Sequence, residues 1–420
     1  MQKEVVITGL GFVTSIGNSI DAVESSLREQ KSGIERYAPF VDNNEPVSVM
    51  GTIKGFDLSS PEQEDWTYPE RFWLSRSMLR GMSPHSLYSI SAVEDALIDA
   101  GLDKKETSNP RTGLYGASGG STSMMHYNLT RLKKLGVDRV NPKGIVSSVA
   151  GTLTFNLVSY FKIQGFSSGF VSACASSGHA IGFAWDAIYN GHQDRMIVVG
   201  AEDGDVDCIL PFAGMRALSV NPDPTKASRP FDKDRDGFVG TGGATALILE
   251  ERSIAEARGA KIYGRFLGWG QSSDGYNPVL PLPDGSGLAR SMTSALEQAN
   301  VQPSNVGYLN AHAPSTPFGD AAEIKGIKSI FEEGARPKVS STKALTGHGL
   351  SLASAMEAAF TVLALDRGFL PGSANIENLD PMTDGVPILR QSEETSCDFA
   401  MSTSSGFGGA NVSLVFGREA

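Results

Sequence analysis

The stretch SSGFVSACASSGHAIGFAWDAIYNG, residues 167–191, decides the fold class. It opens with a short run that resembles a strand and ends at Cys174. Beyond this cysteine, apolar residues recur at helical spacing, at Ile181, Ala184 and Ile188. The stretch therefore predicts a strand, a tight loop and a helix, with Cys174 at the start of the helix.

Units of the same kind recur along the chain. Short apolar strands alternate with segments of helix length, which is typical of α/β layers. The 47 glycines show no tandem period, which argues against solenoid and propeller architectures. We expect one large α/β unit that divides near residue 250 into an N-terminal half, residues 1–250, and a C-terminal half, residues 251–420. The further strand-containing units lie at residues 5–15, 111–120, 195–204 and 305–331.

Composition and charge narrow the possible functions. The chain has 36 basic and 47 acidic residues, a net charge of −11, which argues against broad binding to nucleic acid or to anionic membranes. Three cysteines at irregular spacing suit neither a disulfide framework nor a zinc site, and they favour a reducing cytoplasm. Because no long apolar segment marks a signal peptide or a membrane span, we expect a soluble, unprocessed protein.

Cys174 is the first candidate for chemistry. A thiol at the start of a helix feels the positive end of the helix dipole and nearby free backbone N–H groups, which lowers its pKa and favours the nucleophilic thiolate. Its small neighbours favour an accessible nucleophile. The sequence leaves open the alternative of a small buried core cysteine.

Two histidines form the second candidate group. His312 follows a short strand in YLNAHAPSTPFGD, and His348 follows another in VSSTKALTGHGLSLASAMEAAF. Each alone would more often be structural. Their joint occurrence, with Lys343 five residues before His348, indicates a catalytic site.

Other motifs give weaker signals. The GFGG cluster at residues 406–409 allows close backbone approach to a ligand, although such a cluster is commonly just a tight turn. The acidic spacing at residues 230–244 resembles a calcium loop that lacks its closing carboxylate, and no zinc-type spacing occurs elsewhere, so we predict no metal site. The remaining histidines and cysteines are predicted to be surface or packing residues: His85, His126, His179, His192, Cys208 and Cys397.

Five motifs in order carry a resemblance that spans nearly the whole chain. They are SACAS around Cys174, PFDKDRDGFV, NAHAPSTP around His312, TKALTGHG around Lys343 and His348, and GFGGAN. The set resembles the β-ketoacyl-acyl carrier protein (ACP) synthases of types I and II. The likeness implies an acyltransferase that performs decarboxylative Claisen condensation between a cysteine-bound acyl chain and malonyl-ACP. It also implies the thiolase fold: two similar halves stacked as five α-β-α-β-α layers.

The resemblance assigns roles by position. Cys174 is expected to accept the acyl chain, His312 and His348 to be the catalytic histidines, and Lys343 to be the site lysine. The remaining matches are the gating Phe407, the aromatic Phe238 beside the malonyl group, Thr316 beside the pantetheine arm, Gly120 near the floor of the acyl pocket and the buried structural Glu323 near Lys343.

The resemblance also implies the partners. No cofactor is expected on the enzyme, because the phosphopantetheine arm arrives on the ACP with the acyl and malonyl thioesters. Arg76 and Arg80, four residues apart on a predicted helix, match a basic docking segment for that carrier, although a solvated charged face is the commoner explanation. The family usually forms homodimers, and a heterodimer with a chain-length-factor-like subunit is the alternative.

Several positions depart from the family pattern. Pro314 replaces a hydroxyl residue, Ser351 and Ser354 replace glycines, and Ala410 replaces a threonine. These changes favour a divergent branch in a specialised polyketide or polyene pathway over bulk fatty-acid synthesis. A thiolase would normally carry a second catalytic cysteine where GFGG lies, and a non-catalytic chain-length factor would lack Cys174, so both alternatives are disfavoured.

Overall fold

A single large sheet runs through the molecule. The computed structural model describes residues 2–72 and 74–419. Ten strands form the sheet in the order β10-β9-β11-β12-β8-β1-β7-β6-β4-β5, and a separate two-stranded sheet joins β2 (Ile34–Arg36) to β3 (Val49–Gly51).

The ten strands form two sets of five with the same topology. The first set has the order β5-β4-β6-β7-β1, and the second has the order β10-β9-β11-β12-β8. When the strands of each set are numbered 1 to 5 as they occur along the chain, both sets have the spatial order 3-2-4-5-1. In each set the first three strands of that order pair in parallel and the remaining pairings are antiparallel. The sets meet where β1 and β8 pair. The strands are β1 (Val5–Val13), β4 (Thr112–Ala117), β5 (Ser167–Phe170), β6 (Arg195–Glu202), β7 (Gly243–Glu251), β8 (Gly264–Ser273), β9 (Val306–Asn310), β10 (Lys338–Ser340), β11 (Phe399–Gly406) and β12 (Ala410–Gly417).

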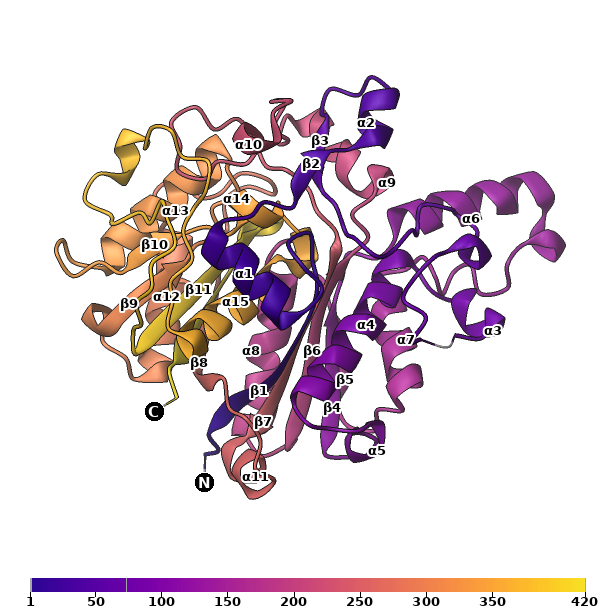
Figure 1. Cartoon of the computed structure of the whole chain (residues 1–420), viewed down its shortest axis with the longest axis horizontal. Coiled ribbons are helices and arrows are strands. Elements are labelled where there is room, and N and C mark those ends of the chain that lie inside the picture. Colours follow the sequence, from indigo (N-terminus) through magenta and orange to yellow (C-terminus); the bar gives the residue numbers. More distant parts are fainter. Residues whose placement is uncertain (1, 73, 420) are drawn as a thin grey trace.

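Helices cover both faces of each five-stranded set. At the centre, α8 (Ser176–Tyr189) and α15 (Ala353–Arg367) pack against each other and against strands of both sets (Figure 1). On the outer faces, α4 (Pro84–Asp99) and α7 (Thr152–Phe161) cover the first set, and α12 (Ser286–Ala299) and α13 (Pro317–Ile330) cover the second. This arrangement confirms the expected α/β class and the five layers. The chain passes from β7 to β8 between residues 251 and 264, and a division into folding units near residue 250 stays a prediction.

The position of α15 in the central layer explains why its sequence is largely apolar on all sides. A helix that is packed on all sides must be apolar all round, and every residue from Ala353 to Leu365 is buried. The charged residue within this buried run is Glu357, a carboxylate in the first half of the helix. A buried charge needs a partner, and this one lies in the site described below.

Nine further α-helices are described. Their bounds are α1 (Ile20–Glu29), α2 (Ala38–Asp42), α3 (Arg76–Leu79), α5 (Lys104–Thr107), α6 (Thr122–Leu135), α9 (Val206–Ile209), α10 (Pro224–Ala227), α11 (Arg252–Ala257) and α14 (Lys343–Thr346). In the part of the chain that the structure describes, no helix combines the length and the apolar character needed to cross a membrane.

Candidate active site

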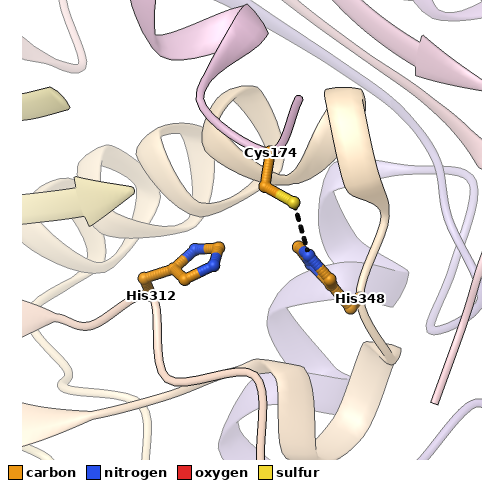
Figure 2. Close-up of side chains that lie close together, drawn as sticks. All are labelled: Cys174, His312 and His348. Carbon is orange, nitrogen blue, oxygen red and sulfur yellow. Dashed lines mark hydrogen bonds between the residues drawn. The ribbon is translucent and has the colours of Figure 1, made fainter. Parts of the chain in front are cut away.

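A cavity of about 350 Å³ brings the two halves of the chain together. Cys174 lies in it with His312 and His348, whose rings flank the thiol (Figure 2). His348 Nε2 is 3.0 Å from Cys174 Sγ, and the two imidazole rings meet edge to face at a centroid distance of 5.2 Å. The structure thus places in one cavity three residues that are far apart in the sequence.

The loop between β5 and α8 presents the nucleophile. Ala175 is the N-cap of α8, so Cys174 directly precedes the helix, as the sequence predicts. Ala173 has a φ of +50°, a conformation that costs energy for a residue with a side chain. A Cβ atom at Gly406 would lie 3.0 Å from Cys174 N, so the turn after β11 can pass this loop only with glycine.

The predicted lowering of the Cys174 pKa is wrong. Burial raises the pKa of the thiol to about 12, because desolvation disfavours the thiolate more than nearby Lys343 favours it. The positive end of α8 does not outweigh burial. Cys174 therefore rests as a thiol beside a histidine that can accept its proton.

The position of His312 is fixed from its backbone. His312 lies just beyond the end of β9, and its N–H donates to Glu323 Oε1 at 2.9 Å. Ala313 N donates to Glu323 Oε2 at 2.6 Å, and Thr403 Oγ1 donates to Oε1 at 2.7 Å. Glu323 is buried and holds the loop after β9, which gives it a structural place next to the site.

Lys343 determines which ring nitrogen of His312 carries the proton. Its Nζ donates to His312 O at 2.5 Å and lies 3.5 Å from His312 Nδ1. Because an ammonium group only donates, Nδ1 accepts, and the imidazole proton then resides on Nε2. Burial and the nearby Lys343 charge lower the pKa of both His312 and His348 well below their usual value, so both rings are neutral at pH 7.

Glu357 is a site residue that the sequence analysis missed. Its carboxylate forms a buried ion pair with Lys343 Nζ, and both side chains are fully buried. Burial raises the pKa of Glu357 to about 7, and Lys343 opposes that rise. The available signal was a single acidic residue in the apolar stretch of residues 353–365.

The other predicted cavity residues surround this centre. The Phe238 ring meets His348 edge to face at 5.2 Å. Phe407 is 37% exposed and lines the cavity at the turn between β11 and β12. Pro314 and Thr316 line the cavity on the segment between His312 and α13. Their proposed contacts with substrate stay predictions.

Three predicted residues lie elsewhere. Gly120 is not among the residues that line this cavity, and its φ of +92° together with close approach to Ala150 N explains the glycine without reference to an acyl chain. Arg76 and Arg80 also lie outside the cavity. Both arginines form salt bridges with Glu64. Their roles in acyl binding and in docking stay predictions.

The PFDKDRDGFV motif proves to be a structural support. Asp232 Oδ2 accepts the N–H groups of residues 377 and 378, both at 2.8 Å. Arg235 is buried and donates to Pro317 O at 3.0 Å and to Asp380 Oδ2 at 2.6 Å. The motif ties the loop after His312 to the segment near Asp380, which accounts for its charges without a calcium ion.

The cysteine and the two histidines also form a set of possible metal ligands. One ligand atom from each of Cys174, His312 and His348 lies within 4.8 Å of the others. A metal ion would require the thiolate, and burial favours the thiol instead. That no metal takes part stays a prediction.

Comparisons with known proteins cover almost the entire chain. Residues 2–255 match the family model described as the N-terminal domain of β-ketoacyl synthase, and residues 263–377 match its C-terminal domain. The chain is 38% identical to 3-oxoacyl-[acyl-carrier-protein] synthase 1 of Haemophilus influenzae over 99% of each chain. A crystal structure of a β-ketoacyl synthase from Burkholderia phymatum superposes with a TM-score of 0.91 at 32% identity, covering 100% of both chains. A ketosynthase solved in complex with a type II polyketide synthase acyl-carrier protein gives 0.88 at 25% identity, again over 100% of both chains.

Proposed function

Because the chain belongs to the β-ketoacyl synthase family, we propose that it is a 3-oxoacyl-ACP synthase that uses Cys174, His312 and His348. It joins a Cys174-bound acyl chain to malonyl-ACP with loss of CO₂, in fatty-acid or type II polyketide synthesis. The observation that carries this proposal is the placement of the thiol 3.0 Å from His348 Nε2, with His312 beside both, in one cavity.

The first step is acyl transfer. Cys174 Sγ attacks the carbonyl carbon of the incoming acyl thioester, and His348 Nε2 is placed to accept the thiol proton. The tetrahedral intermediate then expels the carrier's sulfur, which receives that proton and leaves as a free thiol. The N–H groups of Cys174 and Phe407, on the two loops that meet at Gly406, are proposed to stabilise the oxyanion.

The second step forms the carbon–carbon bond. Loss of CO₂ from the malonyl thioester leaves the electron pair of the broken bond as an enolate, whose oxygen needs hydrogen-bond donors. His312 offers its Nε2 proton, because Lys343 lies at Nδ1. The enolate carbon attacks the acyl carbonyl, the bond to Cys174 Sγ breaks, and the released thiolate takes one proton from solvent.

The carrier protein is proposed to be the partner that supplies both thioesters. Its phosphopantetheine arm would pass Pro314 and Thr316, which lie along the cavity with His312 and Cys174. Arg76 and Arg80 are proposed to contact its acidic surface. Both arginines already pair with Glu64, so docking has to compete with that carboxylate.

The enzyme is further proposed to act as a homodimer in the cytoplasm. The three free cysteines suit a reducing compartment. The strand β5 at the edge of the sheet is exposed over most of its length, which leaves a surface for a second copy. A heterodimer with a chain-length-factor-like subunit is the competing assembly.

The proposal is tested with a panel of acyl-ACPs and malonyl-ACP, read by intact mass. We expect one acyl group per chain at Cys174, none in Cys174→Ala, and formation of 3-oxoacyl-ACP. His312→Ala should retain acylation and lose condensation by roughly 10²–10³-fold, the usual effect of removing one such donor. His348→Ala should slow acylation as well, because His348 Nε2 is placed to accept the thiol proton. An acyl group on Cys208 or Cys397, or condensation by Cys174→Ala, would refute the assignment.

A further inference from the structure

We propose that Ser354 is a positioning residue that fixes the nucleophile through the backbone carbonyl of Cys174, an inference that rests on the proposed acyl transfer. Ser354 Oγ lies 3.1 Å from Cys174 O and 2.7 Å from Ser404 Oγ. Both serine side chains are buried. Glycine is usual at position 354 in the family that this sequence resembles, so the contact belongs to this chain's own sequence.

The chemistry of the groups gives the hydrogen bonds a direction. Ser354 Oγ is the donor to both acceptors, Cys174 O and Ser404 Oγ, so its single hydroxyl proton is shared between them. The chain of hydrogen bonds runs from β11 through the first turn of α15 to the nucleophile, so the C-terminal half holds a residue of the N-terminal half.

The carbonyl has few other partners. Cys174 precedes the first turn of α8, and no backbone N–H in the described part of the chain donates to its oxygen. The neighbouring Ala173, at a φ of +50°, is in a conformation that persists only where the surroundings impose it. Ser176 Oγ fixes one carbonyl of this loop by donating to Ala173 O at 2.6 Å, and Ser354 fixes the next.

Loss of the Ser354 hydroxyl should affect acylation of Cys174 more than decarboxylation of malonyl-ACP. If the peptide group of Cys174 rotates, the thiol moves relative to His348 Nε2 and to the incoming carbonyl, and nucleophilic attack is sensitive to such displacements. Decarboxylation of malonyl-ACP depends on the Nε2 donor of His312, which Ser354 does not contact. Loss of the hydroxyl should therefore slow acylation selectively.

The test compares Ser354→Ala with Ser351→Ala. Ser351 is a buried serine three residues earlier, and no hydrogen bond joins its hydroxyl to Cys174 among the described residues. Two rates are measured: acylation of Cys174 by the acyl-ACP that the wild type accepts best, and CO₂ release from malonyl-ACP. Ser354→Ala should slow acylation by about ten- to a hundredfold, the scale expected for a displaced nucleophile, while its CO₂ release and both rates of Ser351→Ala change little.

The outcomes separate the possible explanations. Unchanged acylation in Ser354→Ala, or an equal fall in both rates, would overturn the positioning role. If that variant does not fold, Ser354→Gly is measured in the same way. If the wild type is neither acylated nor releases CO₂, the proposed function fails by itself. Alkylation of Cys174 by iodoacetamide then still tests the inference, since it should be slower without the Ser354 hydroxyl, and an unchanged rate would refute it.

Discussion

The state of Cys174 at rest depends on burial more than on its place at a helix end. A helix N-terminus stabilises a thiolate by roughly 0.3–1 kcal/mol when exposed, whereas loss of hydration on burial shifts ionisable groups by up to several pKa units. The pKa of about 12 follows from that imbalance. Proton removal therefore has to accompany attack, and His348 Nε2 at 3.0 Å is the group placed for it.

His85 shows how the surroundings separate two residues that look alike in sequence. The sequence predicts both His85 and His126 to be surface or packing residues. His85 is fully buried, and its Nδ1 lies 2.5 Å from Asp203 Oδ1. His126 is exposed and its Nδ1 is 3.3 Å from Asp207. Only the first is a buried ion pair.

The His85 pair predicts a pH-dependent stability. Burial lowers the pKa of His85, but the charge of Asp203 and its hydrogen bond outweigh burial, so the pKa is raised overall. A raised folded-state pKa adds stability that is complete below the unfolded value of about 6.5 and is lost as the pH rises through the folded value. Thermal unfolding from pH 5.5 upward should show this decline in the wild type, measured as Tm in ~0.5-unit steps.

Substitution of the two histidines isolates the effect. His85→Gln should lower the stability by about 3–5 kcal/mol at low pH, because Asp203 loses its buried partner, and should flatten the decline. His126→Gln is the matched control, and an exposed pair of this kind is worth about 0–1 kcal/mol. An unaltered Tm profile in His85→Gln would show that the pair is not charged in the folded protein.

At the level of elements, β5 is one of the two edge strands of the ten-stranded sheet, and β10 is the other. Its residues Ser167–Gly169 are exposed, and apolar side chains flank it at Phe166 and Val171, which are 45% and 63% exposed. Proteins usually cover such an edge strand or place charged side chains on it. β5 itself is mostly exposed and has no charged residue. A second copy that pairs here would extend the sheet across the dimer.

This edge gives a prediction about assembly. Val171→Glu places a charge in the proposed interface and should shift the protein from dimer to monomer in sedimentation equilibrium, because a buried unpaired charge costs several kcal/mol. Val220→Glu is a matched control, since Val220 is also 63% exposed but lies in the segment between α9 and α10. A dimer that survives Val171→Glu, or dissociates equally in both variants, would exclude β5 as the interface.

At the scale of the whole molecule, charge opposes the proposed partner. The net charge of −11 repels an acidic carrier protein over a distance, so only a local basic surface can reverse the field. Arg76 and Arg80 on and beside α3 are the predicted surface, weakened by their shared pairing with Glu64. Docking should therefore depend strongly on salt.

Charge reversal tests this surface. Arg80→Glu should weaken ACP binding in a salt-dependent way and should spare reaction with small acyl thioesters that need no docking. Lys31→Glu, an exposed position, makes the same change in net charge and is the control. The reaction rates with ACP substrates and with small thioesters are measured at low and high ionic strength. An equal fall in both rates would indicate a defect outside docking.

The class of the fold, the nucleophile loop and the family could all be predicted from the sequence. These depend on neighbours along the chain: alternating strands and helices, the Cys174 turn and the short motifs around His312 and His348 are local patterns. The structure alone decided what depends on distant residues. One such feature is the strand order that both halves share. The ion pair of Glu357 with Lys343 joins residues 14 apart, and the hydrogen bond from Ser354 to Cys174 joins residues 180 apart. Burial likewise depends on the packing of the whole molecule. The local sequence therefore predicts a lowered Cys174 pKa, whereas burial of the thiol raises it.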